Sequence, residues 1–107
     1  MYEKLFNTFI VFQLFTITAS VKVGGVLQVA QAGDSPNFLL RALTSGQVTI
    51  IGPIPTGSSY YTTARTHPPG EYYVEFTGTI GGQFYSGNGG ASSQFITTSD
   101  ISFELNF

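Results

Sequence analysis

The chain has 107 residues, which is enough for one domain with a single core. It has no cysteine, so a disulfide framework and a thiolate metal site are both excluded. Charged residues make up only 9% of the chain, against about 25% in a typical globular domain, and the net charge of −2 argues against binding to nucleic acid. With so few charges and 10 phenylalanines, much of the surface is expected to be covered by other proteins.

Within the first segment, residues 1–14, the stretch 5–14 is apolar on both parities of a strand. Such a strand needs cover on both faces, whereas an ordinary strand of a two-layer sandwich is covered on one. Two explanations remain open: a longer first strand that lies under the chain's own loops, or an arm that docks onto a neighbouring subunit. The arm hypothesis predicts an interface made by Phe6, Phe9, Ile10, Phe12 and Leu14.

Residues 5–19 also have the apolar character of a secretory signal, with Ile17-Thr18-Ala19 as a weak cleavage site. The stretch is too short to span a bilayer, and polar residues interrupt it. Apolar and polar residues alternate across the cleavage site from Phe15 to Val23, so cleavage would halve a strand. We therefore expect a strand over residues 15–23 rather than a removed leader, and no membrane as a partner.

Period-two alternation recurs through the rest of the chain between turns rich in glycine and proline, and no helical period of useful length occurs. About seven to nine short antiparallel strands with a turn every 8–12 residues or so are typical of a β-sandwich. The sequence therefore predicts an all-β fold, with one sandwich domain over residues 15–107 after the arm. The strands expected after the first are residues 26–30, 37–43, 47–51, 59–65, 71–80, 83–86, 94–98 and 101–107.

The side chains that catalysis or metal binding would need are sparse. His67 is the only histidine, which excludes a site with several histidines in one chain. Glu71 and Glu75 fall on the same face of one strand, roughly 13 Å apart, which is too far for a pair of glycosidase carboxylates. Asp34 and Asp100 lack the spacing of a calcium loop. The sequence therefore predicts a protein that is not an enzyme and that has no metal, cofactor or catalytic site.

Tyrosines and one glycine-rich loop are the remaining candidates for contacts. Tyr61, Tyr73 and Tyr85 are candidate surface aromatic contacts, and one reading of the tyrosines is a sugar-stacking platform formed by Tyr60, Tyr61, Tyr72, Tyr73 and Tyr85. The alternative is that adjacent tyrosines in a strand alternate between core and surface. Residues 86–93 read as a flexible loop, and Asn88 within it is a secondary candidate for the interface.

Pro69-Gly70-Glu71-Tyr72 opens an alternating strand and looks like the corner before a late strand of immunoglobulin-like sandwiches, where a tyrosine packs inward. The order of the surrounding turns resembles the immunoglobulin-like accessory domains in virion proteins of tailed bacteriophages. This resemblance covers about residues 15–86 and rests on turn and strand patterns; residues 5–14 and 88–107 do not match it. The runs that carry it are Val21-Lys22-Val23-Gly24-Gly25, Asp34-Ser35-Pro36, Leu40-Arg41-Ala42-Leu43-Thr44-Ser45-Gly46, Ile51-Gly52-Pro53, Tyr60-Tyr61 and residues 70–82.

The resemblance implies an immunoglobulin-like sandwich that serves as a capsid decoration or cement protein, which binds between capsid subunits and stabilises the shell. Its partner would be the major capsid protein or another virion protein, with copies of the chain forming a homo-oligomer on the particle. Two alternatives stay open. One is an accessory protein of the phage tail or fibre that binds the host or a glycan through surface tyrosines, and the other is a secreted bacterial adhesin or matrix subunit at the cell surface.

Overall fold

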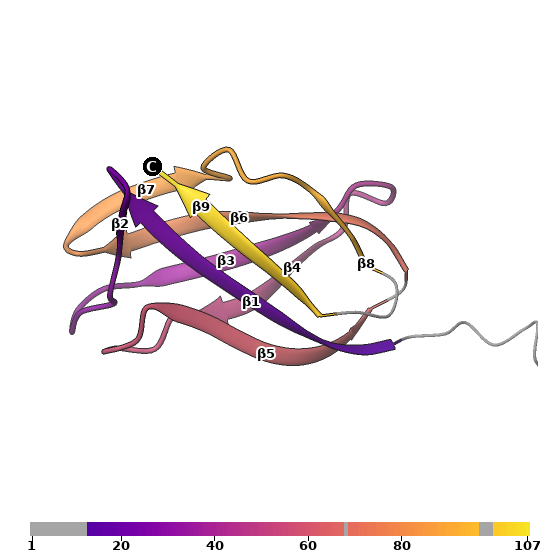
Figure 1. Ribbon diagram of the computed structural model, residues 1–107, viewed down its shortest axis with the longest axis horizontal. Coiled ribbons are helices and arrows are strands. Elements are labelled where there is room, and N and C mark those ends of the chain that lie inside the picture. Colours follow the sequence, from indigo (N-terminus) through magenta and orange to yellow (C-terminus); the bar gives the residue numbers. More distant parts are fainter. Residues whose placement is uncertain (1–12, 68, 97–99) are drawn as a thin grey trace, which may run out of the picture.

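The computed structural model describes residues 13–67, 69–96 and 100–107. In these ranges the chain forms nine strands and no helix, and hence no helix that could cross a membrane. The strands build two sheets that pack face to face (Figure 1), which confirms the prediction of an all-β fold. In chain order they are β1 (Gln13–Val23), β2 (Val26–Leu27), β3 (Pro36–Ala42), β4 (Val48–Pro53), β5 (Tyr60–His67), β6 (Gly70–Ile80), β7 (Gln83–Gly87), β8 (Gln94–Ile96) and β9 (Ile101–Asn106).

Sheet A is built around β1, with β5 antiparallel to it along one edge. The short β2 lies on the same edge of β1 as β5, and there the Val21 carbonyl accepts a hydrogen bond from Gln28 N at 2.9 Å. On the other edge, the Lys22 carbonyl accepts a bond from Phe107 N at 2.8 Å, and β9 runs there parallel to β1. This pair departs from the antiparallel arrangement that was expected. The chain crosses from sheet B to sheet A before β9 and enters at the end of the molecule where β1 begins (Figure 1).

Sheet B has the strand order β4-β3-β6, and the far edge of β6 is shared by β7 and β8. β7 pairs with residues 76–80 of β6, while β8 pairs with residues 70–72. β4 is an edge strand, so it can include Pro53, which has no backbone N–H to donate. The alternation had predicted an end of this strand at Ile51.

The core lies between the two sheets and consists of alternate residues of their strands, together with Ala30 and Ile54 from the connecting loops. Phe38 of β3 and Phe76 of β6 are cross-strand partners whose ring centroids lie 5.4 Å apart, and both are fully buried. The faces of β1, β3, β6 and β9 that were expected to point inward do so. Alternate side chains of a strand point to the same face, and burial of these apolar side chains stabilises the fold. The buried apolar residues are Ile17, Ala19, Val21, Ala30, Phe38, Leu40, Ile51, Ile54, Tyr61, Tyr72, Val74, Phe76, Ile80, Phe103 and Leu105.

The first strand starts before residue 15, where the sandwich was expected to begin. Gln13 and Leu14 belong to β1 and pair with His67 and Thr66 of β5. These two positions are therefore part of the sheet, and the boundary between a leading arm and the sandwich falls earlier than residue 14. The other arm residues proposed for the interface, Phe6, Phe9, Ile10 and Phe12, lie outside the described residues.

Asp34 joins the loop after β2 to the turn between β6 and β7. Its carboxylate accepts hydrogen bonds from the backbone N–H groups of Gln31 at 2.8 Å, Gly81 at 2.9 Å and Gly82 at 3.1 Å. The bond from Gln31, with smaller contributions from the two glycines, lowers the pKa of Asp34, while desolvation opposes this effect. A residue that is isolated in the sequence thus ties two distant turns together.

The Asp34 bonds predict a specific loss of stability in acid. Because its pKa is lower in the folded chain, the carboxylate stabilises the fold fully above its ordinary pKa of 3.8 and loses this effect as the pH falls through the folded-state value. We expect Asp34→Asn to have a lower midpoint of thermal unfolding at pH 7 and a smaller further drop in acid than the wild type. Circular dichroism melts between about pH 7 and pH 2 measure both midpoints. Parallel pH curves for the two proteins would contradict the role given to this carboxylate.

Candidate functional site

Tyr61 was expected at the surface, but the structure places it in the core, where it is 9% exposed. β5 pairs it with Ala19, which faces inward and is fully buried. Its ring centroid lies 6.3 Å from that of Phe38, and a Cβ built on Gly52 would lie 2.5 Å from Tyr61 Cε1, so the ring occupies the space that a side chain would need. The neighbouring Tyr60 faces outward instead and is 49% exposed.

The other two tyrosines differ in position. Tyr73 is half-buried on the outer face of sheet B, where the Arg41 guanidinium carbon lies 5.7 Å from its ring centroid. Arg41 also donates a hydrogen bond of 3.0 Å to Glu75, and this bond raises the pKa of the guanidinium. Tyr85 packs against Phe107, with ring centroids 5.4 Å apart, at the margin of the core. Of these two side chains, Tyr73 is the one available on an outer sheet face.

Asn88 is exposed in the turn that follows β7. Its Oδ1 accepts a hydrogen bond from Gly90 N at 3.0 Å, and its backbone carbonyl accepts one from Ala91 N at 2.9 Å. The Gly89 carbonyl accepts a further hydrogen bond from Asn106 N at 3.0 Å, which holds the turn against the end of β9. The turn is thus held by its own hydrogen bonds with Asn88 on its surface, and its contact with a partner stays a prediction.

Where β1 has a paired neighbour on both edges, the outer face of sheet A is a grid of three rows, each with one residue of β1 in the middle. The row through Ser20 has large side chains on both sides of a small one, because Tyr60 and Glu104 flank it. This difference in size hollows the face at its centre. The rows are Thr62–Thr18–Ser102, Tyr60–Ser20–Glu104 and Leu27–Lys22–Asn106.

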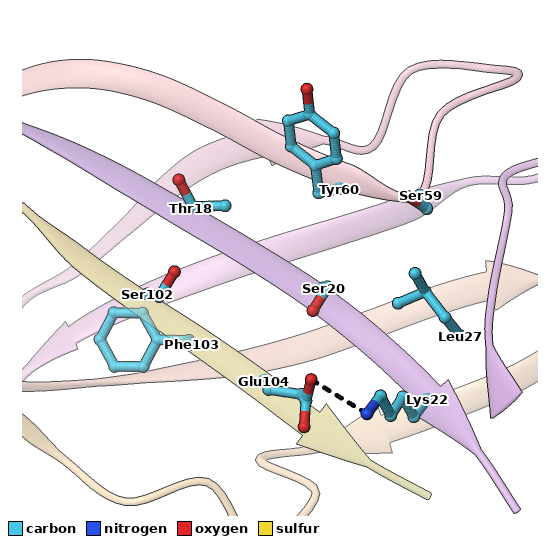
Figure 2. Close-up of a pocket in the computed structure, with 9 residues that line it drawn as sticks. All are labelled: Thr18, Ser20, Lys22, Leu27, Ser59, Tyr60, Ser102, Phe103 and Glu104. Carbon is cyan, nitrogen blue, oxygen red and sulfur yellow. Dashed lines mark ion pairs between the residues drawn. The ribbon is translucent and has the colours of Figure 1, made fainter. Parts of the chain in front are cut away.

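A shallow, open groove of about 480 Å³ results, which we call the sheet A groove (Figure 2). Tyr60 stands on one side of it, and Lys22 and Glu104 stand on the other. Lys22 Nζ lies 3.3 Å from Glu104 Oε2, so the two charges balance each other. The groove therefore offers one exposed aromatic ring, the apolar side chain of Leu27, several hydroxyl groups and a paired donor and acceptor. Thr18 and Ser20 of β1 supply hydroxyl groups between the two sides, and Ser102 supplies one on β9, the strand of Glu104.

Of the groove residues, the sequence singled out only Tyr60, as one member of the candidate sugar-stacking platform. The available signal was the polar parity of β1, from Thr16 to Lys22, which marks an outer face. That signal does not say which strands lie on each side of β1, and the groove depends on both neighbours. Tyr60 in particular comes to the surface because its partner Ser20 faces outward.

The second surface lies on the outer face of sheet B, where exposed apolar side chains lie beside the charged Arg41, Glu71 and Glu75. Strand pairing gathers its exposed side chains at the end of the sheet that carries the turn between β3 and β4. The half-buried Leu39 and Tyr73 lie among them. Exposed apolar clusters on small proteins mark contacts with other proteins. We call this surface the sheet B face; its exposed members are Leu43, Val48, Ile50 and Phe95, whose exposed fractions lie between 41% and 66%.

The two surfaces lie on opposite sides of the sandwich, because each is the outer face of its own sheet. Among the described residues, no three histidine, aspartate or glutamate side chains are grouped closely enough to hold a metal ion. Comparison of this chain with protein-family models, with curated protein sequences and with solved structures found no significant match.

Proposed function

We propose that this chain is a structural protein of a virion, a decoration or cement protein that binds between capsid subunits and stabilises the shell. The observation that carries the proposal is the sheet B face. Its exposed side chains would be buried against the major capsid protein or another virion protein. Each would contribute about 1 kcal/mol before ordering costs, and this contribution is repeated in every copy on the particle.

We infer an immunoglobulin-like identity for the sandwich from the way the strands are divided between the sheets. In such folds strands B and E share one sheet, and strands C, F and G share the other. Here β1 and β5 would take the places of B and E, and β3, β6 and β7 those of C, F and G. Tyr72, near the start of β6, is 6% exposed, and its burial raises its pKa. Its inward position supports the expected corner before this strand.

The leading segment would add a second contact. Residues 5–12 are apolar on both parities in the sequence, and cover by a neighbouring subunit would satisfy both faces. Several copies docked in this way would form a homo-oligomer on the particle. The sheet B face and the leading segment would then act together to fix the chain at its place in the shell.

Replacing Phe95 with lysine tests the proposal, because the ammonium group would have to be desolvated in the interface. In virus particles purified from the virus that encodes this chain, we expect the number of wild-type copies per particle to be comparable with the number of major capsid subunits. Phe95→Lys should lower this occupancy at least about ten-fold. Quantitative mass spectrometry of the particles measures both values, and thermal melts of the free chain confirm that the variant folds.

Phe84→Lys is the matched control. Phe84 is 67% exposed and Phe95 is 66% exposed, and both lie on the outer face of sheet B. They pair with Thr79 and Glu71 of β6, which are eight residues apart and therefore about 27 Å from each other. The control should join particles normally. Virus particles without the wild-type chain would contradict the virion proposal. An equal loss of occupancy for Phe95→Lys and Phe84→Lys would contradict the role of the sheet B face.

A further inference from the structure

We propose that the sheet A groove binds a neutral carbohydrate. The first reason is the exposed aromatic ring of Tyr60, which stands at one side of the groove (Figure 2). Aromatic rings bind through their faces and bury a large area with few rotatable bonds, and a tyrosine also keeps a polar tip. The apolar C–H face of a pyranose ring can pack against such a ring.

The second reason is the polar lining opposite Tyr60. A sugar hydroxyl is both a donor and an acceptor, so a site for it needs both kinds of partner close together. Lys22 supplies N–H donors and Glu104 supplies acceptor oxygens, with 3.3 Å between the two groups. A hydrogen bond between a charged group and a neutral group is stronger than one between two neutral groups. The hydroxyl group of Ser20 extends this lining across the floor, and that of Ser102 extends it along β9.

The charge of the groove selects a neutral ligand. Lys22 is the one cationic side chain among the lining residues, and it is already paired with Glu104. An anionic ligand would have to displace this carboxylate or lie against it, which like-charge repulsion disfavours. A purely apolar ligand would leave the ion pair without water and without a partner. A neutral polyhydroxylated ring meets both requirements.

The size of the groove also fits this ligand. Tyr60 and Glu104 lie on strands that are two interstrand spacings apart, which is about 10 Å. This width takes one or two sugar rings side by side. Ser20 lies midway between them, so a larger side chain at this position would fill the floor. The groove is independent of the sheet B face, and so this inference does not depend on the virion proposal.

The test begins with a glycan array that carries neutral, sialylated and sulfated oligosaccharides, probed with the full chain. We expect binding to a set of neutral glycans. With the best of these in solution, isothermal titration calorimetry should show Tyr60→Ala at least about ten-fold weaker than the wild type and Tyr60→Phe within about three-fold of it. Ser20→Leu should also bind at least about ten-fold more weakly, because it fills the floor while it leaves the ring in place.

Ser86→Leu is the matched control, since Ser86 is exposed on a strand of the other sheet and should bind as the wild type does. Thermal melts show whether each variant is folded. An array without neutral ligands, or with acidic ligands alone, would overturn the proposal. So would a neutral ligand whose affinity is unchanged by both Tyr60→Ala and Ser20→Leu.

Discussion

Gly78→Ala is expected to destabilise the fold by at least about 3 kcal/mol. Gly78 lies in β6 with φ +132°, and a Cβ built there would lie 1.7 Å from the Ser35 carbonyl oxygen. That oxygen belongs to the backbone just before β3 and accepts a hydrogen bond from Thr79 N at 3.2 Å. It can move away only if the pairing between β3 and β6 opens at this end, from Pro36 opposite Gly78 onward.

Chemical denaturation of the wild type and the variant measures this loss as a difference in the free energy of unfolding. Gly25→Ala separates the clash from the cost of the backbone conformation, because Gly25 has φ +82° and nothing within 4 Å of its Cβ position. The control should lose about 1 kcal/mol. An effect at Gly78 that is no larger than the effect at Gly25 would show that β3 and β6 do not approach each other as closely as described.

Tyr61→Ala should cost about 3 kcal/mol of stability, while Tyr60→Ala should cost no more than about 0.5 kcal/mol. The two residues are adjacent and chemically identical, and they differ in the face of β5 that they occupy. Tyr61 is 9% exposed against Phe38 and Gly52, so its removal leaves a cavity between the sheets. Tyr60 is 49% exposed in the sheet A groove, so its removal exposes little new surface.

Urea unfolding of the two variants under the same conditions compares them directly. Tyr61→Phe is the conservative control, because it keeps the ring in the core and removes only the hydroxyl group. It should retain most of the stability that Tyr61→Ala loses. If Tyr60→Ala proved the more costly substitution, the register between β1 and β5 would be wrong by one residue, since a shift of one residue exchanges the two faces of a strand.

Much of the fold could be predicted because apolar and polar residues alternate along most of the strands with a period of two. In β1 the order Ile17, Ala19, Val21 identifies an inward face, and β9 shows the same pattern with Phe103 and Leu105. This rule needs no partner strand, because alternate side chains of any strand point to opposite faces. The all-β class, most strand positions and most of the core followed from it. The pattern of β5 did not identify its inward face, since Tyr60, Tyr61 and the threonines after them suit either one.

The sequence by itself determined the all-β class and the inward faces of most strands, because hydrophobic alternation is a local property of the chain. The tertiary structure alone decided which strands became neighbours. The parallel pairing of β9 with β1 and the antiparallel pairing of β5 bring Glu104 and Tyr60 to the two sides of Ser20, although they are 84 and 40 residues away from it in the chain. Such pairings depend on the path of the chain between the two sheets and on the shared burial of the whole core, and no single segment encodes them.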